Sequence, residues 1–334
     1  MAQIHYRKES DRTLRRVKSG RSFRFVDEKG KAVTGTSADR IRKLAIPPAW
    51  KDVVISPDPL DYIQAIGVDA RGRRQYIYHP EWVKRNQEYK FDQMIAFGER
   101  LPDLRKTVSA HMREHRLSED RVLATVVWLL EHTFIRVGNT KYAEEDHSYG
   151  LTTMRDKHVS IKGSTMTFSF EGKSGVFHEL EISDPRVAKT VRECVDIPGF
   201  ELFQYLDEKG RRKSISSEEV NTYLKTYTGA DFSAKDFRTW GGSVLAGDSL
   251  YKKGNAADET DLKHKIAEVV EIVSDHLGNT KSVCRKYYIH PVIFESYEKK
   301  ILVPHFKRSY ERKSTKKLGL TVEEYATWSL IKDS

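Results

Sequence analysis

The chain has 334 residues, with 58 Lys and Arg against 48 Asp and Glu, so its formal net charge is +10 at pH 7. This excess of positive charge predicts a polyanionic partner, and no apolar run is long enough to cross a bilayer. The chain has two cysteines, Cys194 and Cys284, so we do not expect a disulfide framework. It has no GxxxxGK[ST] loop, which argues against a nucleotide-driven motor, and no CxxC pair or HExxH motif that would support a metal site.

The first 82 residues have the pattern of a small, mostly β domain. Short segments rich in aromatic and β-branched residues are bounded by Gly, Pro and Asp, as strands and turns are. These segments are SFRFVD, WKDVVIS, DYIQAIGVD and RQYIYHP. A basic run from Arg7 to Arg24 is either a solvated arm or the start of a sheet. Phe23 and Phe25, at its C-terminal end, favour the sheet.

After Trp82 the apolar periodicity becomes helical. Ser118 begins an amphipathic helix that we expect to continue to Gly138, which places Arg136 in its last turn. Further helices are predicted at 184–196, 216–228, 233–246, 258–278 and 321–332. One predicted hairpin interrupts them, because MTFSF and VFHELEI flank EGKSG and place Lys173 at the turn. We therefore expect an α+β fold, with a β-rich domain at 1–82 and a mainly helical domain at 83–334 that carries a β-hairpin.

The segment LGNTKSVCRKYYIHP is the most informative in the chain. Tyr288 follows Arg285 and Lys286 and lies nine residues after Asn279. A free phenol is a poor nucleophile because its pKa is roughly 10, but a positive field favours the phenolate and a negatively charged phosphorane. Taken alone, Tyr287 and Tyr288 are more typical of half-buried aromatic residues before a helix end.

Four other positions are of interest because of the predicted elements on which they lie, although an ordinary structural role would also account for most of them. Arg136 near a helix end also suits the helix dipole, and most hairpin lysines, such as Lys173, are simply solvated. Asn279 after Gly278 is a routine helix-terminal residue. Arg238 differs, because it lies on an aromatic segment one turn into a helix, where an arginine usually has a specific partner.

The order of these elements resembles the type IB DNA topoisomerases in their short bacterial and poxvirus-like form. FIRVGNTKY, GLTTMRDKHV, FEGKSGVFHE, KDFRTWGG and the Tyr288 segment are similar to that family's catalytic blocks in the family's order, and IPPAW with DARGRRQYIYHPEW is similar to its N-terminal block. The resemblance covers nearly the whole chain and implies a catalytic domain related to the tyrosine recombinase fold. It also implies relaxation of supercoiled duplex DNA by transient single-strand cleavage through a 3′-phosphotyrosyl intermediate, strand rotation and religation, without ATP, metal or cofactor.

The same resemblance implies the identity of the nucleophile. Tyr288 is chosen over Tyr287 because the family places its nucleophile immediately before an Ile-His-Pro-like sequence. Asn279 stands where the poxvirus pattern has histidine, and its amide is still a neutral donor to a phosphate oxygen.

Four basic residues receive roles from the same source. Arg136 and Arg238 would bind the scissile phosphate, and Lys173 would act as general acid, with assistance from Lys235. Two guanidinium forks suit this work because they hold the non-bridging oxygens of a phosphorane in bidentate geometry. An ammonium suits the departing 5′ oxygen, which is an alkoxide unless it is protonated.

The resemblance further implies contacts to duplex DNA outside the chemical site. Gln75, Tyr76 and Tyr78 match family positions that touch DNA in the major groove, and Lys141 and Tyr142 match family positions near the DNA. Under this reading, Arg71, Arg73 and Arg74 would hold the DNA backbone. Strand alternation puts Gln75 and Tyr76 on opposite faces, so both reach DNA only if the strand is bent or lies at an edge. We expect a monomer clamped around DNA, cytoplasmic and associated with the nucleoid, with no membrane or nucleotide partner.

Two other functions remain open at this point. A tyrosine recombinase or integrase uses nearly the same chemistry, but the IPPAW and QYIYHP blocks favour the topoisomerase because recombinases usually carry a helical arm-binding domain. A basic DNA-binding protein without catalysis would also account for the charge and the aromatic residues.

Overall fold

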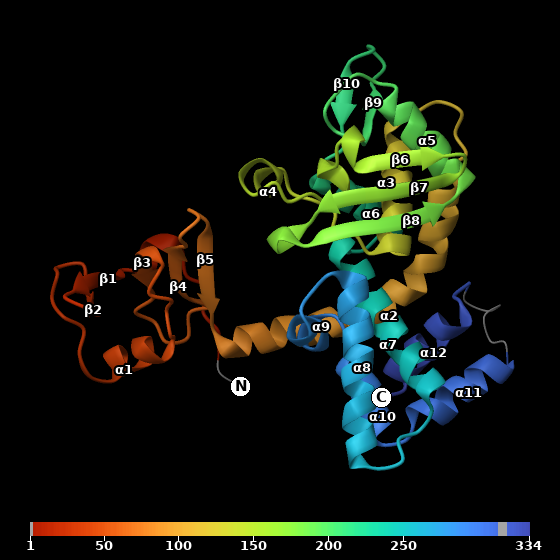
Figure 1. Ribbon diagram of the computed structural model, residues 1–334. Helices are drawn as coiled ribbons and strands as arrows, with labels where there is room; N and C mark the ends of the chain where they lie inside the picture. The colour runs from red at the N-terminus through yellow and green to blue at the C-terminus, as the bar shows by residue number, and fades with distance from the viewer. Residues whose placement is uncertain (1–2, 313–318) are drawn as a thin grey trace. The chain divides into compact units, whose positions relative to one another are not determined.

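The computed structural model describes residues 3–312 and 319–334, and the chain divides into two compact units, Met1–Lys90 and Phe91–Ser334 (Figure 1). The first unit is built on one antiparallel sheet of five strands in the order β2-β1-β3-β4-β5. The strands are β1 Leu14–Ser19, β2 Ser22–Val26, β3 Lys51–Ile55, β4 Ile63–Val68 and β5 Arg74–Tyr78. A 3-10 helix at Glu9–Asp11 precedes β1, and α1, Gly35–Lys43, separates β2 from β3.

The core of this unit lies between the sheet and α1. It consists of Leu14, Val53, Ile55 and Ala65 from the strands and Ile41 from α1. The basic run is part of the sheet, because β1 and β2 lie within it, as Phe23 and Phe25 indicated. Neither β1 nor α1 was predicted, since a strand as basic as LRRVKS lacks the alternation that marks a buried face.

The second unit is mainly helical. Its helices are α2 Pro80–His111, which begins in the first unit, α3 Glu119–Thr133, α4 Thr140–Glu145, α5 Pro185–Val195, α6 Ser217–Thr228, α7 Ala234–Lys253, α8 Glu259–Leu277, α9 Lys281–Tyr287, α10 Pro291–Glu298, α11 Leu302–Arg312 and α12 Val322–Lys332. Short 3-10 helices occur at Leu151–Thr153, Asp156–His158 and Lys173–Gly175. Together with the first unit, this arrangement confirms the predicted fold class.

A three-stranded antiparallel sheet lies beside the helices, in the order β6-β7-β8 (Figure 1). Its strands are β6 Val159–Lys162, β7 Thr165–Glu171 and β8 Phe177–Ser183. The predicted hairpin is β7 with β8, and Lys173 begins the turn between them. A two-stranded hairpin of β9 Gln204–Leu206 and β10 Arg212–Ser214 completes the strands of this unit among the described residues. The third strand β6 and the β9–β10 hairpin were not predicted, because each is only three or four residues long.

The helices of this unit surround two apolar cores, and α7 belongs to both. Its N-terminal half contributes Phe237 and Trp240 to a core with α2, α3, α5 and α6. Its C-terminal half contributes Ala246 and Leu250 to a core with α8 and α10–α12. Arg238 therefore stands on a helix that is fixed on several sides. The helix also runs to Lys253, seven residues beyond the predicted end at 246, because these apolar residues continue its buried face.

One predicted boundary is wrong in a way that matters for function. The helix from Ser118 ends at Thr133, and Phe134 adopts a left-handed conformation with φ 52°. Arg136 is therefore not in a last helical turn, as the sequence predicted, but in the extended segment that follows. The Phe134 ring occupies the space where a β-carbon on Gly241 of α7 would stand. This tertiary contact, which no local pattern reveals, accompanies the early end of the helix.

Candidate active site

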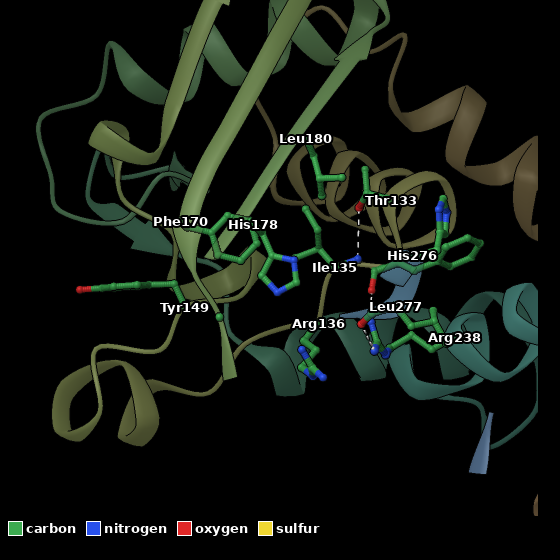
Figure 2. Close-up of a pocket in the computed structure, with 12 residues that line it drawn as sticks. Thr133, Ile135, Arg136, Tyr149, Phe170, His178, Leu180, Arg238, His276 and Leu277 are labelled. Carbon is green, nitrogen blue, oxygen red and sulfur yellow. Dashed lines mark hydrogen bonds between the residues drawn. The ribbon is translucent and has the colours of Figure 1, made fainter. Parts of the chain in front are cut away.

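A pocket lies where the end of α3, the β7–β8 hairpin, α7 and the end of α8 converge (Figure 2). Arg136 and Arg238 line it together with His178 from β8 and Leu277 from α8. These residues come from four separate stretches of the chain, so the pocket exists only in the folded unit.

Arg136 reaches from the extended segment to the C-terminal end of α8. Its Nη2 donates to the carbonyl of Gly278 at 3.0 Å and to Oδ1 of Asn279. Its own carbonyl accepts the backbone N–H of Leu151 at 2.9 Å. The side chain is half-buried. Its backbone and its guanidinium are therefore both fixed by residues distant in sequence.

Arg238 stands in the second turn of α7 and is only 4% exposed. The helix begins after Ser233, whose backbone N–H and hydroxyl donate to the Asp236 carboxylate at 2.8 Å and 3.0 Å. The Arg238 guanidinium donates to the carbonyls of Phe134 and Leu277, the latter at 2.7 Å. Its Nε is buried and has no hydrogen-bond partner among the residues that the structure describes.

The two guanidinium groups create a buried positive field. Burial lowers the pKa of Arg136 to about 10, and the charge of Arg238 acts in the same direction. Burial also lowers the pKa of Arg238, while Tyr288 opposes that shift. Within residues 3–312 and 319–334, no carboxylate forms an ion pair with either arginine. Since a charge held away from water without a counter-ion is costly, an anion beside this pair would be favoured.

Asn279 follows the C-cap residue of α8 and orients its amide toward the same place. Because Arg136 can only donate, the amide oxygen must face it, which leaves Nδ2 as the outward donor. Burial raises the pKa of the nearby Cys284 thiol, and Asn279 opposes that shift. A thiol is a weak acceptor, however, and no hydrogen bond of ordinary geometry reaches Nδ2 in the described structure. The amide is thus available to a further acceptor.

Tyr288 is the C-cap residue of α9 and is half-buried. The guanidinium carbon of Arg238 lies 5.2 Å from the centroid of its ring. The ring of Tyr287 instead lies 5.2 Å from Nζ of Lys286. The two adjacent tyrosines are therefore in different surroundings, and Tyr288 is the one that contacts the buried arginine.

Ser243 and Gly242 of α7 hold the backbone of Tyr288. The Ser243 hydroxyl accepts the N–H of His290 at 2.9 Å and lies 3.3 Å from the carbonyl of Tyr288. A β-carbon on Gly242 would stand 2.8 Å from that same carbonyl oxygen. Neither residue was predicted, although the small-residue run GGS, which begins three residues after Arg238, is a signal of close backbone approach.

The two candidate lysines lie outside the pocket. Lys173 is exposed in the β7–β8 turn, while its neighbour Gly172 lines the pocket. Lys235 is exposed in the first turn of α7 and does not line the pocket. The structure thus brings Arg136, Arg238, Asn279 and Tyr288 together, leaves Lys173 at the margin, and does not bring Lys235 to them.

In the first unit, the candidate DNA contacts divide between the two faces of β5, which is an edge strand. Tyr76 and Tyr78 stack on one another with ring centroids 6.0 Å apart, and the Arg74 guanidinium lies over Tyr76 at 5.8 Å. Tyr76 is 41% exposed, so this face presents a half-exposed aromatic surface. Gln75 and Ile77 occupy the other face, and Ile77 packs against the core. The predicted alternation is confirmed.

The neighbouring turn DARGR is held by one carboxylate. Asp69 accepts the backbone N–H groups of Arg71 and Arg73 at 2.9 Å and 3.0 Å, and its other oxygen accepts from Gln75 at 2.9 Å. Arg73 also forms an ion pair with Asp69 at 2.9 Å. Gln75 and Arg73 therefore share Asp69, whereas Arg74 is paired with the exposed Glu9 at 2.6 Å.

Lys141 and Tyr142 belong to α4 in the second unit. Both are exposed, and Lys141 lies 3.9 Å from Glu145 on the same short helix. This contact is weak enough to leave the ammonium available to a phosphate.

Comparison with known proteins assigns the chain to a protein family. The family model for the catalytic core of eukaryotic DNA topoisomerase I matches residues 80–316, and that for the N-terminal domain of bacterial DNA topoisomerase IB matches residues 22–69. The chain belongs to the type IB DNA topoisomerases. The N-terminal match covers the IPPAW block, one of the two blocks on which the distinction from recombinases depended. A type IB topoisomerase is a type I DNA topoisomerase, so the chain is an enzyme of that class.

Relatives of this topoisomerase include viral and fungal proteins. A DNA topoisomerase 1B of Acanthamoeba polyphaga mimivirus is 31% identical over 291 residues, which cover 85% of this chain and 87% of the viral protein. DNA topoisomerase 1B of vaccinia virus strain Copenhagen is 25% identical over 270 residues, covering 78% and 82%. DNA topoisomerase 1 of Schizosaccharomyces pombe is 26% identical over 230 residues, covering 67% of this chain and 26% of the fungal protein.

The described residues also bear on membrane and metal partners. None of the helices there is both long and apolar enough to span a membrane. No group of three or more His, Cys, Asp or Glu side chains there could hold a metal ion.

Proposed function

We propose that this topoisomerase relaxes supercoiled duplex DNA by cutting one strand with Tyr288, holding the 3′ phosphate covalently while the cut end rotates, and resealing the strand. The observation that carries the proposal is the pair of guanidinium groups of the half-buried Arg136 and the buried Arg238 beside Tyr288, which have no carboxylate partner within the described structure. A scissile phosphodiester would supply the missing anion. Asn279 Nδ2 and Arg238 Nε would then find the acceptor that they lack in the described structure.

The chemistry follows from these donors. As the bond between Tyr288 Oη and phosphorus forms, the bond between phosphorus and O5′ breaks, and negative charge builds on the two non-bridging oxygens. Arg136 and Arg238 stabilise that charge, which is the work of a preorganised electrostatic site, worth about 10²–10³ in rate for each donor. The phenolic proton passes to solvent, and the ammonium of Lys173 protonates the departing O5′.

The phosphotyrosyl bond keeps the free energy of the broken backbone bond, so religation needs no nucleotide. We therefore propose that the reaction runs without ATP and without a metal ion, since guanidinium groups supply the positive charge. Lys173 suits the acid role because it lies at the tip of a hairpin, where its side chain can follow the substrate. Lys235 is a weaker candidate, since neither of its chain neighbours lines the pocket, whereas Gly172 next to Lys173 does.

The remaining partner is duplex DNA, contacted by a monomer that closes around it. The exposed face of β5, with Tyr76, Tyr78 and Arg74, and the exposed residues of α4 supply the surface that this proposal requires. Because phosphate contacts release counterions, DNA binding should weaken steeply with salt. A DNA-bound enzyme of this kind would act at the nucleoid.

The proposal is tested by trapping the covalent complex. We expect the wild-type enzyme to form an adduct with a nicked duplex and to relax a plasmid that lacks any recombination site, in EDTA and without ATP. Tyr288→Phe should bind DNA and form no adduct, while the matched control Tyr287→Phe should still form it. An adduct that persists in Tyr288→Phe would assign the nucleophile elsewhere, and loss of adduct only in Tyr287→Phe would reverse the assignment.

A further inference from the structure

The imidazole of His178 lies between two glycines that precede two residues of the proposed site. On one side, a β-carbon on Gly172 would come within 2.7 Å of Cδ2 and Nε2 of the ring. On the other side, a β-carbon on Gly278 would overlap Cε1. Lys173 follows Gly172, and Asn279 follows Gly278. One ring therefore contacts both the hairpin turn and the end of α8.

The two sides of this contact differ in how firmly they are held. The end of α8 is fixed, because the Leu277 carbonyl accepts from Arg238 at 2.7 Å and the Gly278 carbonyl accepts from Arg136 at 3.0 Å. The turn is the looser side. Residues 173–177 are all exposed, and the turn is closed at its base by the N–H of Gly172, which donates to the Val176 carbonyl at 2.7 Å.

His178 itself is held in place by the neighbouring strand. Its ring stacks on Phe170 of β7, with ring centroids 5.1 Å apart and 18° between the planes. Burial lowers the pKa of His178, and the charges of Arg136 and Arg238 act in the same direction. The imidazole is therefore uncharged near neutral pH and adds no third cation to the pocket.

We propose that His178 is a positioning residue for Lys173: its ring is a flat spacer that holds Gly172, and with it the turn, at a fixed distance from the end of α8. This inference rests on the proposed function, because it concerns the general acid of that reaction. The imidazole does not touch the reacting atoms. It acts by limiting where the Lys173 ammonium can stand when the 5′ oxygen departs.

The test compares two leaving groups in single-turnover cleavage of a duplex. With the natural 5′ oxygen, we expect His178→Ala to slow cleavage about 100-fold, since a misplacement of about 1 Å has effects of that size. With a 5′ sulfur at the scissile bond, a thiolate leaves without an acid, so we expect the variant to come within about 3-fold of wild type. A purely structural role would slow both substrates equally.

A second variant approaches the same contact from the other side. Gly172 has φ −94°, a conformation open to alanine, so Gly172→Ala tests the contact with the ring and not backbone strain. Its methyl group would push the turn away from His178, and we expect the same dependence on the leaving group. Leu180→Ala is the matched control, because Leu180 lies on the same strand, is half-buried and lines the same pocket. Its ratio of sulfur to oxygen rates should equal that of wild type.

Lys173→Ala distinguishes failure of the acid role of Lys173 from failure of the positioning role of His178. If its oxygen defect is not restored by sulfur, the acid role of Lys173 is wrong and the inference about His178 falls with it. If Lys173→Ala is restored but His178→Ala and Gly172→Ala stay equally slow on both substrates, only the inference about His178 is overturned. Restoration of all three supports it.

Discussion

Arg12 in the first unit and Arg238 in the second are each only 4% exposed, yet only the charge of Arg12 has a counter-ion within the described structure. Arg12 lies 3.0 Å from the buried Asp61 carboxylate and also donates to the Ile63 carbonyl at 3.1 Å. Arg238 donates to two backbone carbonyls, and no carboxylate pairs with it within the described structure. The fold itself thus supplies the negative charge that Arg12 needs, whereas the described residues supply none to Arg238.

The difference does not follow from the unit in which each arginine lies. Arg121 belongs to the second unit and is 1% exposed, and it is paired with Glu193 at 2.7 Å and bonded to Thr190 at 3.1 Å. Arg121 and Arg12 thus have a carboxylate partner within the described structure, whereas Arg238 donates to backbone carbonyls and has no carboxylate partner there. Burial alone therefore does not distinguish these three arginines, but the presence of a carboxylate does.

The largest effect that tests this comparison is expected for Arg238→Ala. Loss of the guanidinium should slow single-turnover cleavage by about 10³ or more, because it removes several donors from the phosphorane. The midpoint of thermal unfolding should change little, since removal of an uncompensated charge offsets the loss of two hydrogen bonds. Arg238→Lys keeps the charge without the fork and should remain strongly impaired. Cleavage near the wild-type rate in either variant would break the comparison.

The paired arginine should show the reverse behaviour. Arg12→Met leaves the Asp61 carboxylate buried and unpaired, so we expect the free energy of unfolding to fall by about 3–5 kcal/mol. Arg12→Met with Asp61→Leu removes both charges and should recover most of that loss. Urea unfolding measures both changes, and the cleavage rate of the folded fraction should stay at the wild-type level. A double variant no more stable than the single one would contradict the structural role of the pair.

A smaller effect is expected from His290, which is buried next to the Tyr288 segment. Burial lowers the pKa of His290 to about 4, and its Nδ1 accepts the N–H of Val292 at 3.2 Å. The unfolded chain takes up this proton near pH 6.5, so the stability from the neutral ring is complete above that pH and is lost as the pH falls toward 4.

This contribution is on the order of 3 kcal/mol between the two limits. His290→Asn keeps an N-cap acceptor that does not titrate. We therefore expect a flatter dependence of the free energy of unfolding on pH between 6.5 and 4 than in wild type, measured by urea titration at several pH values. An equal slope in both proteins would show that His290 does not titrate in this way.

Much of the scaffold was predictable because its signals are local. The alternation in MTFSF and VFHELEI predicted β7 and β8, and the glycine-bounded EGKSG between them predicted the turn with Lys173. Ser118 caps α3 by accepting the N–H of Arg121, as its position indicated. Short strands such as β6 and β10 gave no such signal, since three or four residues hold too little periodicity.

The candidate site was likewise predictable where its signals are local and not where it depends on tertiary contacts. Sequence pattern and family resemblance named Arg136, Arg238, Asn279 and Tyr288, and the fold brings these four together. The predicted helical setting of Arg136 was wrong, because the left-handed Phe134 packs against Gly241 of α7, a residue about a hundred positions away. His178 was missed because its neighbours, Gly172 and Gly278, meet it only after folding.

The sequence by itself determined the family, the fold class and which residue types are present to act on a phosphodiester. Only the tertiary structure decided which of two adjacent tyrosines contacts a buried arginine and which arginines have no carboxylate. The physical reason is that charge compensation and side-chain contact depend on distances between elements far apart in sequence. Local propensity carries no information about those distances.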